Sequence, residues 1–78
     1  MNNSEKYSKV FTKTFSIDKS KLKKLKYQST PQWDSVGHMS MIGSLEDIFK
    51  ITMDMDDIID FSSFEKGKKI LKKYKITI

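Results

Sequence analysis

Residues 33–49 read WDSVGHMSMIGSLEDIF, and they carry the clearest structural pattern in this chain. Apolar side chains recur there at steps of three and four, which predicts an amphipathic helix over about residues 35–50. Asp34 or Ser35 can cap this helix, because both side chains accept hydrogen bonds from the free backbone N–H groups at a helix start. The apolar stripe comprises His38, Met41, Ile42, Leu45, Ile48 and Phe49.

The flanking segments predict further helices. Ser4 is the expected N-cap of the first of these helices, and Asp54 is the expected N-cap of a short helix later in the chain. Ser62 at N-cap with Glu65 at N3 matches a capping box before the last helix. In the short helix we expect Ile58 and Ile59 to pack inward, and we expect the tail after the last helix to fray or to pack loosely. These helices span about residues 4–15, 54–60 and 63–74.

The segment 16–33 is rich in lysine and serine, and we read it as a long ordered loop, with a short helix at 19–26 as the alternative. Its apolar residues are expected to fasten it to the core. The sequence as a whole therefore predicts an all-α fold, a small four-helix bundle with a long first loop and a short third helix. The apolar residues of the segment are Ile17, Leu22, Leu25 and Trp33.

Composition bounds the function. The chain has 78 residues and no cysteine, so we expect a single domain that folds on apolar packing without disulfides or thiolate metal sites. No apolar run approaches the ~20 residues of a membrane span, and the first residues are polar, so we expect a cytoplasmic protein without stable membrane insertion. All fifteen basic residues are lysine. Without arginine, sequence-specific binding to nucleic acid is disfavoured.

The charge is unevenly distributed along the chain. Residues 1–33 carry a net charge of +6, residues 34–65 carry −7, and residues 66–78 carry +6. The middle third of the chain is therefore acidic although the whole is basic.

Ser35 lies three residues before His38, the only histidine, which raises the question of a catalytic serine. We reject that interpretation because the flanking residues lack the first glycine of a G-x-S-x-G elbow and the chain is short for an oxyanion hole. We expect no enzymatic activity, and we expect His38 to lie at the edge of the core with its polar atoms satisfied locally. Taken alone, Asp34-Ser35 would be a helix cap. A third possibility is a modified serine, because a phosphodiester is favoured at the positive end of a helix.

The pattern W-D-S-V-G-H-M-x-M-I-x-x-L-E-D-x-F over residues 33–49 resembles the 4′-phosphopantetheine attachment motif of acyl carrier proteins. That family typically reads D-S-L followed by an amphipathic helix ending in L-E-x-x-F. The spacing of the later acidic turn, serine cap and final helix extends the resemblance over residues 4–74. The resemblance implies a four-helix bundle of acyl-carrier-protein type that carries an acyl or aminoacyl group as a thioester.

Carried over by position, Ser35 would hold the covalent 4′-phosphopantetheine from coenzyme A, with Asp34 and Val36 as the flanking signature. The partners implied are a phosphopantetheinyl transferase, an acyl- or aminoacyl-loading ligase and a downstream acyltransferase or synthase. We expect a monomer. The resemblance also implies a partner-binding face made of Met39, Glu46, Asp47, Asp56 and Asp57, whose acidic members would meet basic patches.

Two departures from the family pattern bear on the pathway. The chain is basic overall, and Val36 replaces the commoner leucine. Gly37 and Ser40 also stand where acids are frequent, so the acidic face is thinner near Ser35. We therefore expect a dedicated biosynthetic pathway rather than housekeeping fatty-acid synthesis.

Two features keep alternatives open. The run KSKLKKLK at 19–26 would, in a non-carrier helical interaction module, bind a membrane surface or an acidic partner, with Ser35 only a cap. Four methionines are most simply core residues, and in a carrier they would alternatively line a soft cavity for a short acyl chain. These are Met39, Met41, Met53 and Met55.

Overall fold

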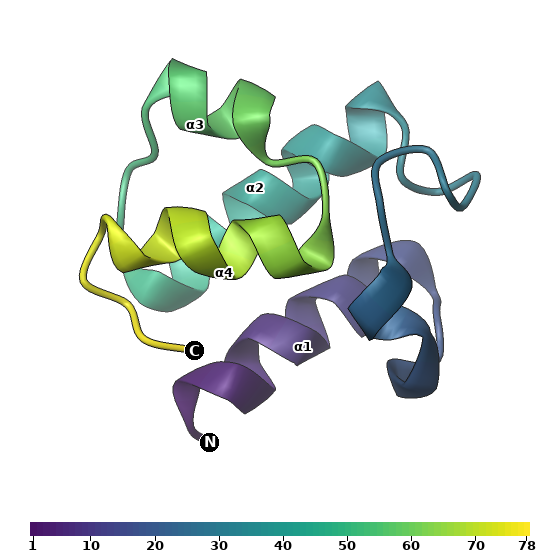
Figure 1. Ribbon diagram of the computed structural model, residues 1–78, viewed down its shortest axis with the longest axis horizontal. Helices are drawn as coiled ribbons and strands as arrows, with labels where there is room; N and C mark the ends of the chain where they lie inside the picture. The colour runs from purple at the N-terminus through teal and green to yellow at the C-terminus, as the bar shows by residue number, and fades with distance from the viewer.

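The computed structural model describes residues 1–78 and contains helices but no strands (Figure 1). The expected all-helical fold is confirmed. None of the helices combines the length and the apolarity that a membrane crossing requires. The elements are α1 (Asn3–Phe15), the 3₁₀ helix η1 (Lys19–Lys24), α2 (Ser35–Phe49), α3 (Met55–Asp60) and α4 (Phe64–Lys72).

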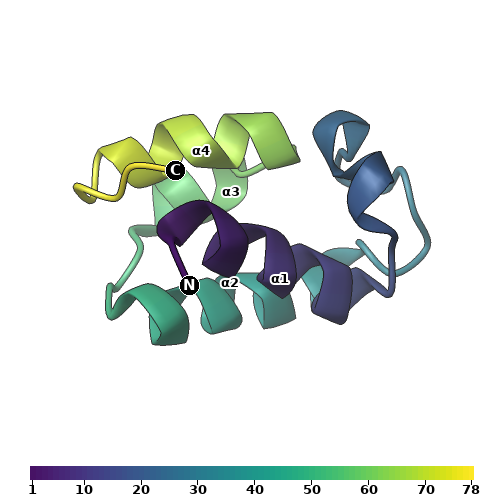
Figure 2. The same cartoon turned by 90° about the horizontal axis from the view of Figure 1, so that it is seen from below.

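The core lies between α1, α2 and α4, and α1 runs alongside both of the others (Figures 1 and 2). Its centre is aromatic: Phe11 lies 5.0 Å from Phe64 and 5.7 Å from Trp33 between ring centroids. The Tyr7 hydroxyl donates a 2.6 Å hydrogen bond to the Phe64 carbonyl, and burial raises the pKa of this phenol well above its ordinary value. Apolar and aromatic packing thus joins the first helix to the last.

The segment between α1 and α2 is ordered by apolar anchors, as expected, and it also contains the 3₁₀ helix. Leu22, Leu25 and Trp33 are buried, whereas Ile17 is only partly covered. Two backbone hydrogen bonds tie the segment to the start of α4, from Tyr27 N–H to the Ser62 carbonyl (2.9 Å) and from Phe64 N–H to the Leu25 carbonyl (3.0 Å). The long segment is therefore fixed against both the core and α4.

Helix starts differ from the predicted caps. Asn2, not Ser4, caps α1 and accepts from Glu5 N–H at 2.8 Å. Ser63, not Ser62, caps α4, because the Ser62 carbonyl is already used by Tyr27. The predicted Ser62–Glu65 capping box is therefore wrong by one residue.

Two packing expectations are also corrected. Ile59 does not pack inward: it is 70% exposed, and its neighbour Ile58 is the residue of α3 that packs against the core, as expected. The C-terminal tail neither frays nor packs loosely at Ile76, which is buried in the core. The two chain ends lie together (Figures 1 and 2), where the Asn3 amide donates to the Thr77 carbonyl at 3.2 Å.

Candidate functional site

The start of α2 separates the roles of two adjacent residues. Asp34 has extended backbone and is the N-cap: its Oδ1 accepts a 2.8 Å hydrogen bond from Gly37 N–H. Ser35 is the first helical residue, it is exposed, and no other group in the protein hydrogen-bonds its hydroxyl. The interpretation of Ser35 as the cap is therefore wrong, and its hydroxyl is free.

Gly37 allows the turn before α2 to pack closely against the first turn of this helix. A Cβ atom there would overlap the carbonyl oxygen of Gln32 and lie 3.3 Å from the Phe15 ring. The turn before α2 can therefore press against the helix only because position 37 has no side chain.

His38 joins the loop, α2 and α3 through hydrogen bonds. Trp33 Nε1 donates to His38 Nδ1 at 2.9 Å, and His38 Nε2 lies 2.7 Å from the Ile58 carbonyl oxygen. Because an indole N–H can only donate, Nδ1 must accept, and we infer that the ring proton is on Nε2 and is donated to Ile58.

These contacts decide the role of the histidine beside Ser35. Both ring nitrogens are occupied, and the ring stacks on Trp33 with centroids 6.1 Å apart. His38 is therefore a half-buried residue at the core edge with its polar atoms satisfied, as expected. It has no free nitrogen with which to take a proton from Ser35.

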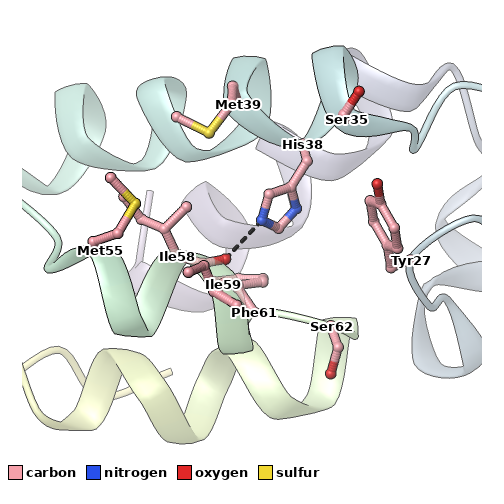
Figure 3. Close-up of a pocket in the computed structure, with 9 residues that line it drawn as sticks. All are labelled: Tyr27, Ser35, His38, Met39, Met55, Ile58, Ile59, Phe61 and Ser62. Carbon is pink, nitrogen blue, oxygen red and sulfur yellow. Dashed lines mark hydrogen bonds between the residues drawn. The ribbon is translucent and has the colours of Figure 1, made fainter.

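A groove opens between α2 and α3 with Ser35 on its rim (Figure 3). Its volume is about 390 Å³, and no carboxylate or ammonium group lines it. Met39 and Met55 stand on opposite walls and are 53% and 69% exposed. The groove is thus apolar and open to solvent. Its lining residues are Tyr27, Ser35, His38, Met39, Met55, Ile58, Ile59, Phe61 and Ser62.

The four methionines divide between two environments. Met41 and Met53 are buried in the core, whereas Met39 and Met55 line the groove. The core interpretation is therefore confirmed for Met41 and Met53 and is wrong for Met39 and Met55.

The predicted partner-facing residues do not form one surface. Met39 and Asp56 are exposed, but the Glu46 carboxylate is turned inward and accepts from Met53 N–H at 2.9 Å. Asp47 is exposed on the side of α2 that faces α1, in a shallow hollow that Lys9 also lines. Val36, predicted as part of the serine signature, is 77% exposed beside Ser35.

Placing Asp57 on an exposed acidic face is wrong, because only 5% of this residue is accessible. Its carboxylate accepts 2.6 Å hydrogen bonds from Lys73 Nζ and from the Tyr74 hydroxyl. These bonds, that from Lys73 foremost, hold the pKa of Asp57 below its ordinary value, and the same ion pair raises the pKa of Lys73. Asp57 thus fastens α3 to the two residues that follow α4, Lys73 and Tyr74.

Sequence reasoning missed Tyr27 and Phe61 as groove residues. Tyr27 lies in a turn outside any periodic pattern, and Phe61 follows the last residue of α3. The sequence interpretation also did not include the pairing of Trp33 with His38. The two residues are five apart across a helix start, and two rings can meet at that spacing. No group of three or more side chains of the kinds that bind metal gathers anywhere in the protein.

Comparisons with protein-family models, with curated proteins and with solved structures give no match for this chain. Function is therefore inferred from the residues and geometry of the chain itself.

Proposed function

We propose that this protein is a carrier that holds a 4′-phosphopantetheine arm on Ser35 and presents a thioester-bound acyl or aminoacyl group to partner enzymes. The observation that carries the proposal is the division of roles at the start of α2. Asp34 supplies the cap, so the Ser35 hydroxyl is exposed and unengaged at the end of a 15-residue helix. A phosphodiester formed there would lie at the positive end of the helix dipole.

The sequence motif and the helix order support the same proposal. Residues 33–49 resemble the carrier attachment motif, and Ser35 of that motif is the free serine. A long connection before α2, a short α3 and a final α4 follow in the order that the carrier family implies. We therefore assign the fold, as part of the proposal, to the four-helix bundle of acyl-carrier-protein type.

The groove beside Ser35 supports a role in sheltering cargo. The pantetheine thiol carries the cargo, and the arm begins on the rim of a groove with apolar walls. Met39 and Met55 are flexible and polarisable, so they can adapt to acyl groups of different shape. A short apolar acyl group would fit against them, and a charged aminoacyl group would stay in solvent.

The chemistry itself belongs to partner enzymes. A phosphopantetheinyl transferase would join the Ser35 oxygen to the phosphorus that bears pantetheine, and the nucleotide half of coenzyme A would leave. A ligase would load the thiol, and an acyltransferase or synthase would unload it. His38 has no free nitrogen for any of these steps. With a thin acidic face near Ser35, a dedicated pathway fits better than general fatty-acid synthesis.

The test is intact mass after incubation with coenzyme A and a promiscuous phosphopantetheinyl transferase. We expect the wild type to gain one phosphopantetheine and Ser35→Ala to gain none. Ser40→Ala, an exposed serine on the same helix, is the matched control and should load normally. Ser35→Ala should change the free energy of unfolding by less than about 0.5 kcal/mol, because the hydroxyl bonds to no other group. Loading of Ser35→Ala, or no loading of a folded and unmodified wild type, would refute the proposal.

A further inference from the structure

The segment around η1 concentrates the positive charge of the molecule. Residues 19–26 hold five lysines and no acid, a charge of +5 that equals the net charge of the whole chain. All five lysines are exposed. The nearest acid is Asp18. Its carboxylate caps η1 by accepting hydrogen bonds from the backbone N–H and the hydroxyl of Ser20. The charge of the segment is therefore left uncompensated.

The basic segment continues onto α4. The segment after η1 is tied to the start of α4 by the backbone bonds of Leu25 and Tyr27, and Lys19, Lys23 and Lys68 line one shallow hollow. Glu65 is the one acid in that hollow, and it pairs with Lys68 at 3.1 Å. Here we call the following set the basic face: Lys19, Lys21, Lys23, Lys24, Lys26 and Lys68.

The character of the basic face selects among polyanionic partners. Protein interfaces need buried aromatic or aliphatic anchors, and none of the large apolar residues exposed in this protein lies on η1 or α4. Single-stranded RNA is bound by arginine and by stacking on exposed aromatic rings. The chain has no arginine, Phe64 beside the basic face is buried, and Tyr27 lines the α2–α3 groove. A surface of anionic headgroups needs only a dense set of flexible ammonium groups.

We propose that the basic face docks the protein peripherally on an anionic lipid surface. η1 lies at the end of the molecule away from the chain termini, where α2 also starts (Figures 1 and 2). Docking through η1 would therefore bring Ser35 near the headgroups while the α2–α3 groove stays open. Docking does not depend on the carrier function. In a loaded carrier it would present the thioester to an enzyme at the membrane surface.

The test is sedimentation with vesicles of phosphatidylcholine alone and of phosphatidylcholine with added phosphatidylglycerol. We expect binding only to the anionic vesicles, and its loss at high salt, where surface charges are screened. The variant K19Q/K21Q/K23Q/K24Q should bind more than about tenfold more weakly, since each lysine near the surface contributes separately.

A control removes the same charge elsewhere. The variant K13Q/K50Q/K69Q/K75Q also replaces four exposed lysines, and it should lose less than about threefold in affinity, because none of these lysines lines the hollows of the basic face. The milder K21Q/K24Q variant, checked for folding by circular dichroism, should show an intermediate loss. Equal losses in the two quadruple variants, or no preference for anionic vesicles, would overturn the proposal. So would tighter binding to single-stranded RNA or to polyglutamate at the same salt.

Discussion

Helices α1 and α3 are held in place by largely different contacts. α1 buries three aromatic rings completely, those of Tyr7, Phe11 and Phe15. α3 has six residues, leaves Met55 and Ile59 largely exposed, and buries a carboxylate instead.

Ile58 is the one apolar side chain of α3 that packs against the core, and the other contacts that hold the helix are polar. His38 bonds to the Ile58 carbonyl, Lys73 and Tyr74 bond to Asp57, and the Tyr74 hydroxyl accepts from Asp54 N–H at 2.9 Å. Asp54 itself makes no side-chain cap, so the predicted role of its carboxylate as a cap is not realised. A single turn or two of helix is marginal on its own, so these bonds decide where α3 lies.

The difference indicates which part of this small protein unfolds locally most easily. Apolar packing is not directional and is shared among many neighbours, whereas each hydrogen bond of α3 depends on one pair of groups. We expect α3 to open at a lower free energy than the rest of the molecule. The groove beside Ser35 has α3 as one wall, so it lies at the less stable side of the fold.

The largest expected effect comes from removing one aromatic ring from the core. Phe11→Ala should lower the free energy of unfolding by about 3–5 kcal/mol, because a fully buried ring leaves a cavity. Ile59→Ala on α3 should change it by less than about 0.5 kcal/mol. Urea unfolding followed by Trp33 fluorescence measures both, since this only tryptophan is buried. A similar loss in the two variants would abolish the contrast between α1 and α3.

A second comparison uses two glycines in different surroundings. A Cβ at Gly67 would overlap both the Phe61 ring and the Tyr7 hydroxyl, so Gly67→Ala should cost about 3 kcal/mol. Gly43 faces open space in the middle of α2, so Gly43→Ala should instead stabilise by about 0.5–1 kcal/mol. Thermal unfolding by circular dichroism separates the two. A stabilised Gly67→Ala would mean that α1 and α4 pack less tightly than the structure shows.

His38→Phe tests the bond between α2 and α3 while keeping an aromatic ring. It leaves Trp33 Nε1 and the Ile58 carbonyl without partners, and it should cost about 1–2 kcal/mol, because the site is half-buried. Hydrogen exchange should accelerate in α3 more than in α1. Uniform acceleration over both helices would show that His38 supports the whole core and not α3 in particular.

The last expected effect, that of replacing Asp57, depends on pH. The folded-state pKa of Asp57 is depressed, so its contribution to stability is present above the ordinary value of 3.8 and is lost as pH falls through the folded pKa. The raised pKa of Lys73 acts in the opposite direction: its share persists below 10.5 and is lost as pH rises through the folded pKa.

Asp57→Asn should therefore be less stable than the wild type at neutral pH, and the difference should close in strong acid. Urea midpoints across the acid range measure it. Asp56→Asn, the exposed neighbour without a bonded partner, should give no such pH-dependent difference. A gap for Asp57→Asn that stays constant down to the lowest pH would show that its ion pair is not what titrates.

The sequence predicted most of what repeated spacing controls. The stripe from Met41 to Leu45 located α2 within a residue, and the apolar anchors Leu22, Leu25 and Trp33 were correctly expected to reach the core. These predictions hold because burial follows helical period over several turns.

The sequence could not show which of two adjacent residues with similar side chains takes a given structural role. Ser62 and Ser63 are both good caps, and only the pairing of the earlier loop with Ser62 leaves Ser63 to start α4. Asp56 and Asp57 are both acids on a short helix, and the position of Lys73 decides which is buried. The same holds at Asp34 and Ser35, where the structure alone identifies the cap.

The separation of Asp34 from Ser35 has a practical consequence for spectroscopy. The chain has no cysteine, so Ser35→Cys would introduce its only thiol. The Ser35 side chain makes no hydrogen bond that stabilises the fold, because Asp34 supplies the helix cap. A maleimide fluorophore attached there would sit on the groove rim, within energy-transfer range of the single buried indole of Trp33. Such a labelled protein would report opening of α3, and contact with vesicles or partner enzymes, without any enzymatic loading step.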